Sequence, residues 1–157
     1  MSYPASLIDF AFVKIGSDEG KFVTQMKLQK LVYFAQGYHL AKYQKPLVIE
    51  NFQAWTYGPV IPVIYNDFKL YGSSPITNTA EYLPSNNDRG PYILDPEAGD
   101  AINYTWYVLK NFSAFALSNW THQPDGPWSK VYVPDVKDTP ISNTDIKQYF
   151  EKLLIRA

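Results

Sequence analysis

The chain has 157 residues, 14 basic and 15 acidic side chains, a net charge of −1 and no cysteine. This length suits one domain, and we expect residues 1–157 to form a single one. The lack of cysteine excludes disulfides, thiolate metal sites and a cysteine nucleophile. The balanced charge, without blocks of either sign, makes nucleic acid an unfavoured partner.

Aromatic residues make up 17% of the chain, including 13 Tyr and 4 Trp. Tyr and Trp are the residues that dominate protein interfaces, so this composition favours recognition of another protein. No apolar run approaches the ~20 residues of a membrane-spanning helix, and the N-terminus does not read as a secretory signal. We therefore expect a cytoplasmic protein with no membrane contact.

The first predicted helices are 6–15, which Gly16 should end, and 25–43, with Thr24 as N-cap and Pro46 just beyond the end. At 100° per residue, the second helix places an apolar sector on one side and Lys30 and Gly37 on the other. The sector comprises Leu28, Leu31, Val32, Ala35 and His39.

His39 is predicted to face inward, together with Leu28, Leu31 and Ala35 as structural core. A buried imidazole needs hydrogen-bond partners, and the backbone of an adjacent loop is the ordinary source. A catalytic base at this position is the alternative.

Residues 48–55 read as a short strand that enters a rigid Tyr57-Gly58-Pro59 corner. Gly58 should supply close backbone approach or an unusual dihedral angle. Trp55 is expected to pack as a core anchor, with an exposed interface residue as the alternative.

A helix is predicted over 62–71, with Gly72 as its stop and a buried stripe made by Ile61, Ile64, Tyr65 and Phe68. Residues 73–91 read as a long irregular connection, and 92–94 as a possible strand. Asp95 then caps a helix that runs to Phe112.

Ser113 is predicted to cap a helix over 114–121, followed by a Pro-Gly turn and a helical turn at Trp128 that Pro134 ends. His122 reads as a turn-capping residue, because two histidines without a third ligand give no metal-site spacing. Residues 142–145 resemble a capping box for a closing amphipathic helix. We predict an α+β, predominantly α fold: a compact bundle of about five to six helices with a small antiparallel sheet, and no bound metal or cofactor.

Three segments with infrequent residue combinations occur in one order. Residues 28–40 read LQKLVYFAQGYHL, 54–60 read AWTYGPV, and 117–122 read LSNWTH, followed by Pro127 and Trp128. This pattern resembles the Panacea domain of the phage-associated, SocA-like antitoxins, and the resemblance covers roughly residues 26 to 132.

The resemblance implies an antitoxin that neutralises a cognate toxin by direct binding, and that can deliver this toxin to the ClpXP protease as an adaptor. The helix-turn-helix that some relatives carry is not evident, so operator binding is not expected. The residues we expect at the partner surface are Trp55, Tyr57, Gly58, Pro59, Trp120, His122 and Trp128. Among them, Tyr57, Trp120 and Trp128 are the candidate aromatic anchors.

Two other classes stay open at this point. A hydrolase would use His39 or His122, with dispersed carboxylates such as Glu50 and Asp67, although no catalytic motif occurs. A phage-encoded scaffold or transcription accessory factor would show a basic surface groove. Oligomeric state and the partner's identity do not follow from the residues.

Overall fold

The computed structural model describes residues 2–77 and 94–156. Over these residues the chain forms seven α-helices and a three-stranded antiparallel sheet, which confirms the predominantly helical α+β prediction. The helices are α1 (Ala5–Asp18), α2 (Gln25–Tyr43), α3 (Pro62–Phe68), α4 (Pro96–Leu109), α5 (Ala114–Thr121), α6 (Pro127–Val131) and α7 (Asn143–Arg156), with a 3₁₀ turn at Lys69–Tyr71. The number exceeds the predicted five to six because the turn at Trp128 forms α6.

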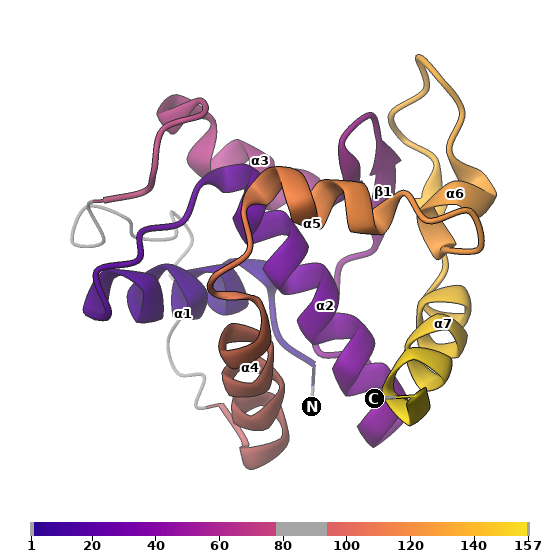
Figure 1. The fold of residues 1–157 in the computed structure, drawn as a ribbon, viewed down its shortest axis with the longest axis horizontal. Helices are drawn as coiled ribbons and strands as arrows, with labels where there is room; N and C mark the ends of the chain where they lie inside the picture. The colour runs from indigo at the N-terminus through magenta and orange to yellow at the C-terminus, as the bar shows by residue number, and fades with distance from the viewer. Residues whose placement is uncertain (1, 78–93, 157) are drawn as a thin grey trace.

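Helix α2 is the centre of the molecule. It contacts α1, α3, α4, α5, α7 and the sheet, and Figure 1 shows α4 and α7 on opposite sides of it, with α5 crossing near its N-terminal half. Thr24 caps α2 as predicted, since its hydroxyl accepts a hydrogen bond from the Lys27 amide at 3.2 Å. Gln44 ends the helix in the left-handed conformation, with φ of 62°.

The side of α2 opposite the predicted apolar sector is buried as well. Lys30 is 1% exposed and Gly37 is buried, because neighbouring elements cover the helix on all sides along most of its length. At Gly37 a Cβ atom would lie 2.1 Å from the ring of Phe150 on α7. Glycine at this position therefore lets α7 pack directly on the α2 backbone.

Polar side chains of α2 bind the backbone of the loops that follow it. Gln36 accepts hydrogen bonds from the Leu47 and Val48 amides at 2.8 and 3.1 Å. Gln29 accepts from the Ile61 amide at 3.0 Å and donates to the Ile61 carbonyl at 3.2 Å. These buried amides satisfy loop groups that would otherwise lose their hydrogen bonds to water. The path of the chain from α2 to α3 is thereby fixed by α2 itself.

The sheet has the strand order β2-β1-β3, all antiparallel: β1 (Phe52–Trp55), β2 (Gly58–Val60) and β3 (Pro140–Ile141). In the β1–β2 hairpin, Trp55 lies opposite Gly58 and Gln53 opposite Val60. The predicted strand over 48–55 is shorter than expected, because Val48 instead forms an isolated parallel bridge with Tyr3.

Helix α1 was predicted to end at Gly16 and instead continues to Asp18. Gly16 is buried, and a Cβ atom there would lie 2.6 Å from the carbonyl oxygen of Lys21. The glycine thus serves the close return of the chain after α1. Helix α3 begins at Pro62 as predicted and Gly72 stops the following 3₁₀ turn, but Tyr65 is 42% exposed, outside the buried stripe.

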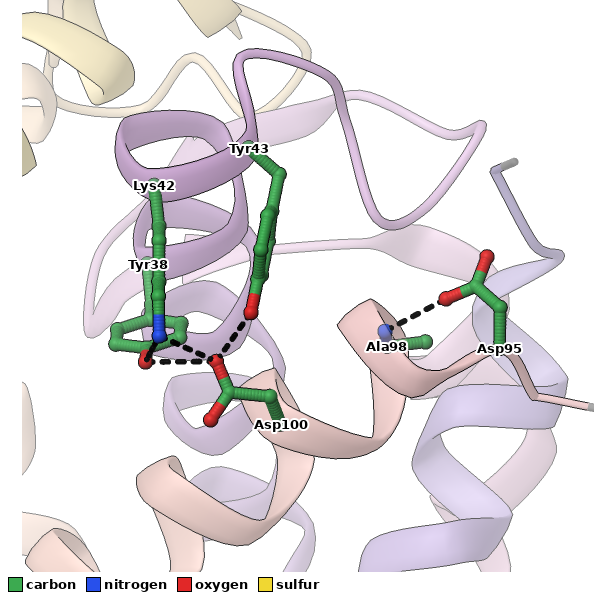
Figure 2. Close-up of polar contacts among 6 residues, drawn as sticks. All are labelled: Tyr38, Lys42, Tyr43, Asp95, Ala98 and Asp100. Atoms are coloured by element: carbon green, nitrogen blue, oxygen red, sulfur yellow. Dashed lines mark hydrogen bonds and ion pairs between the residues drawn. The ribbon is translucent and has the colours of Figure 1, made fainter.

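The caps of the later helices were predicted correctly. Asp95 caps α4 by accepting from the Ala98 amide at 2.8 Å (Figure 2). Ser113 caps α5, and Ser142 accepts from the Asp145 amide at the start of α7. Helix α4 ends at Leu109, before the predicted Phe112, because the chain turns there into α5. The predicted strand at 92–94 and the connection from 78 onward lie outside the described residues.

Candidate protein interface at the β1–β2 corner

The three segments that the sequence singled out meet in space. Residues 54–60, which we call the corner, pack between α2 and the α5–α6 segment. The Trp128 indole Nε1 donates to the Trp55 carbonyl at 2.7 Å, and the Ser118 hydroxyl donates to the Tyr57 carbonyl at 2.6 Å. Residues about 60 to 70 positions apart in sequence therefore build one local structure.

Gly58 can only be glycine in this arrangement. Its φ is +121°, which side-chain-bearing residues rarely adopt. A Cβ atom would also lie 2.6 Å from the Thr121 hydroxyl and 2.7 Å from Lys30 Cε. Both reasons anticipated from the sequence are present, and they bring the corner backbone directly over Lys30 of α2.

Lys30 lies beneath this backbone with little compensation for its burial. Its ammonium donates a long hydrogen bond, 3.4 Å, to the Pro59 carbonyl. Among the described residues, no carboxylate is within ion-pairing distance of it. Burial without a counter-charge lowers the pKa of Lys30 to about 7.

Three aromatic rings support the corner from the side of α6. His122 stacks on Trp128 with 3.8 Å between ring centroids, and Trp128 stacks on Tyr132 at 4.3 Å. Burial, with a smaller contribution from the nearby Lys30 ammonium, lowers the pKa of His122. Trp128 is 8% exposed, so its indole offers little surface to a partner. In the structure the indole supports the corner, and its expected role as an aromatic anchor stays a prediction.

The other predicted surface residues differ widely in exposure. Tyr57 is 64% exposed, Gly58 and Pro59 are buried, and Trp55 and His122 are half-buried. Trp55 is therefore not the core anchor that we expected. Its Nε1 donates to Gln53 at 3.0 Å, and its ring packs against Tyr65 at 5.3 Å.

Trp120 lies apart from the corner groove described next. It is half-buried among aromatic side chains of α2 and α7, with ring centroids 5.9 Å from Phe34 and 5.9 Å from Phe150. Together with residues of α4, α5 and α7 it lines a second, apolar depression of about 350 Å³.

A larger open groove of about 630 Å³ runs along the corner. Its walls include four aromatic side chains and two lysines: Trp55, Tyr57, Tyr65, Phe115, Lys30 and Lys137. We call this depression the corner groove. The Lys137 ammonium lies 5.1 Å above the Trp55 ring, and Phe115 is 73% exposed. Large exposed aromatic side chains around a concavity are typical of a protein-binding surface.

Sequence reasoning missed Lys30, Tyr65, Phe115 and Lys137. Lys30 and Tyr65 were assigned to the wrong faces of their helices. Gln29, Gln36 and His39 share one side of α2, within about 80° at 100° per residue, so the pattern of polar residues carried no signal for the burial of Lys30. Phe115 and Lys137 gave no sequence signal.

The four candidate catalytic residues do not converge. His39 is buried with its Nδ1 2.6 Å from the Lys45 carbonyl, and burial lowers its pKa. His122 follows α5 and lies near Lys30. Lys30 precedes His39 by nine positions on α2, which separates the two by about 13 Å along the helix axis. Glu50 accepts from the Ala5 amide and Asp67 from the Ser6 hydroxyl, both at the start of α1.

The described part of the chain contains neither a cluster of metal ligands nor a helix that could span a membrane. There, no three His, Cys, Asp or Glu side chains lie close enough to hold a metal ion. None of the helices over 2–77 and 94–156 combines the length and apolarity needed to cross a bilayer.

A model of the family described as "Antitoxin SocA-like, Panacea domain" matches residues 28–129, a range that contains all three segments meeting at the corner. The chain belongs to this SocA-like family. It is an antitoxin family and not an enzyme family, so the hydrolase alternative has neither a converged site nor a family to support it.

A SocA-like relative is Antitoxin SocA of Caulobacter vibrioides (strain NA1000 / CB15N), 32% identical over 114 residues. The match covers 69% of this chain and 60% of the relative, so the chain matches less than two thirds of that protein's length. No solved structure matches the chain.

Proposed function

We propose that this SocA-like chain is an antitoxin that neutralises a cognate toxin by direct binding, and that the toxin contacts the corner groove. Family membership and the relative named Antitoxin SocA support the first part. The second part rests on one observation: the family segments meet at the corner, and the corner lines a groove that presents Tyr57 and Phe115, which are 64% and 73% exposed.

The rigidity of the corner favours tight binding. The Trp55 and Tyr57 carbonyls are fixed by Trp128 and Ser118, and the Ile61 backbone is fixed by Gln29. Aromatic side chains on a fixed backbone lose little conformational freedom when a partner binds, so more of the contact energy appears as affinity. The corner is thus preorganised to present its aromatic rings.

Co-expression tests this proposal. The protein encoded by the adjacent gene is expressed alone and with this chain, growth is followed, and the complex is sought by affinity purification. We expect growth arrest by the neighbour alone, rescue by this chain and a stable complex. Absence of both rescue and complex would remove the antitoxin assignment, and purification with nucleic acid in place of a protein would favour an accessory factor of transcription.

We extend the proposal to protease delivery in the cytoplasm, which the family resemblance implies. An adaptor that binds both toxin and ClpXP raises the local concentration of the toxin at the protease. The half-life of the toxin should then shorten when this chain and ClpXP are both present. Equal half-lives with and without ClpXP would restrict the function to neutralisation by binding.

A further inference from the structure

Lys30 is a buried cation at the edge of an open groove. It lines the corner groove although it is 1% exposed, so its side chain lies at the floor and not on the rim. An ammonium group has three donors, and Lys30 has one hydrogen-bond acceptor among the described residues, the Pro59 carbonyl at 3.4 Å. A buried charge with so few partners is costly unless an anion compensates it.

All charged side chains that line the groove among the described residues are positive. Lys30 and Lys137 are its charged side chains in the described part of the chain, and no carboxylate lines it there. The surrounding walls are the rings of Trp55, Tyr57, Tyr65 and Phe115. A ligand that complements this groove carries a negative charge next to an apolar group.

We propose that the corner groove binds a segment of the toxin that presents an aromatic or aliphatic side chain beside a carboxylate, and that Lys30 pairs with that carboxylate. The assignment to a toxin rests on the proposed function. The chemistry of the groove, an apolar group plus a carboxylate, is independent of it and can be tested without the toxin.

A pH dependence follows from this pairing. The pKa of Lys30 is about 7 in the free protein, and a bound carboxylate raises it. Binding therefore takes up a proton above pH 7, and affinity falls by up to about ten-fold per pH unit there. Other titratable or charged groups facing this region are His122 after α5, Lys137 after α6, and the hydroxyls of Tyr57 and Tyr65.

The probe is 3-phenylpropanoate, compared with the neutral 3-phenylpropanamide, each titrated into the protein and followed by NMR of the Trp55 indole and the Lys30 side chain. We expect the carboxylate to bind at least ten-fold more tightly than the amide, with affinity falling from pH 7 to pH 9. Equal affinity of the two compounds, no binding of either, or a pH-independent affinity would overturn the proposal.

Lys30→Met provides the second arm, because it removes the charge and keeps much of the side-chain volume. Lys27→Met is the matched control: Lys27 also lies on α2, but its ammonium donates to the Lys110 carbonyl at 2.6 Å and it does not line the groove. Only Lys30→Met should reduce carboxylate binding, by at least ten-fold, in a protein whose thermal melting is still cooperative. Equal loss in both variants would contradict the role of Lys30.

The two proposals fail in different experiments. Loss of fragment binding with successful growth rescue would leave the antitoxin function standing and remove the carboxylate contact. Fragment binding without any rescue or complex would leave the groove chemistry standing and remove the toxin as its partner.

Discussion

Two lysines of helix α2 occupy opposite environments. Lys42, near the C-terminal end, donates to Asp100 of α4 at 3.0 Å, and the same carboxylate oxygen accepts from the hydroxyls of Tyr38 and Tyr43 (Figure 2). Lys30, in the N-terminal third, makes one long hydrogen bond with the described residues, to the corner backbone. Hydrogen bonds with Tyr38 and Asp100 raise the pKa of Lys42, whereas burial lowers that of Lys30.

This contrast separates a structural contact from a recognition contact. The Asp100 cluster is complete within the chain and ties α4 to α2. Lys30 lacks a counter-charge within the described residues and lies at an open groove. We infer that Lys42 stabilises the fold and that Lys30 binds a partner.

The largest effect is expected from Lys30→Met, measured as unfolding free energy against pH. Because the folded pKa of about 7 lies below the ordinary 10.5, the unfolded chain binds more protons between these values, and wild-type stability rises with pH there. The increase is about 1.4 kcal/mol per pH unit at most. Lys30→Met lacks this increase in stability with pH, because methionine does not titrate.

Lys30→Met should therefore be the more stable protein at pH 6, by ~1–4 kcal/mol, and should lose this advantage by pH 10. Urea denaturation at several pH values measures the difference. A constant difference between wild type and variant from pH 6 to pH 10 would show that Lys30 does not titrate in this range.

Gly58→Ala should break the corner itself. The positive φ and the two short contacts, to Thr121 and Lys30, together predict a loss of about 3 kcal/mol in the free energy of unfolding. Gly20→Ala is the matched control: its φ is +68°, and a Cβ atom there has no neighbour within 4 Å. A loss in Gly58→Ala no larger than the control's, about 1 kcal/mol, would contradict the packing of the corner on α2.

Tyr57→Ala tests the surface of the corner. We expect a loss of about 2 kcal/mol in toxin binding, roughly 30-fold in affinity, with stability unchanged within ~0.5 kcal/mol. Tyr107→Ala on α4 is the control, since this tyrosine is 77% exposed and does not line the groove. Calorimetric titration of the purified toxin measures both variants, and equal affinities would exclude Tyr57 as an anchor.

Asp100→Asn should give the smallest effect, about 1 kcal/mol of stability at pH 7, because the side chain is 36% exposed. Burial raises the pKa of Asp100, but the hydrogen bonds from Tyr43, Tyr38 and Lys42 outweigh it, so the folded pKa is lowered. Its contribution is present above the unfolded pKa of about 4 and is lost as pH falls through the folded value. Wild type and variant should thus converge in thermal melts near pH 2, and a gap that persists there would refute the assignment.

Much of the fold was accessible from local sequence signals. Thr24, Asp95, Ser113 and Ser142 all cap helices where they were predicted to, because a cap is a contact within three residues. The segments that form the candidate site were also identified. Their convergence could not be derived, because it depends on contacts across 61 and 73 positions.

Burial was predicted less well than secondary structure. Amphipathic analysis assumes one solvent face, so it placed Lys30 outside on a helix that is covered on all sides. Trp128 was proposed as an aromatic anchor from its residue type, which carries no information on the His122 and Tyr132 rings that stack on its indole. The role of the predicted surface residues and the extent of the single domain stay predictions.

Hydrogen exchange of the purified toxin complex, compared with the free chain, tests the central claim most directly. Binding at the corner groove predicts slowed amide exchange at residues 54–60 and at the start of α5, with little change at the Asp100 cluster between α2 and α4. Unchanged exchange at 54–60 in a complex that protects other elements, such as the apolar depression between α4 and α7, would contradict it.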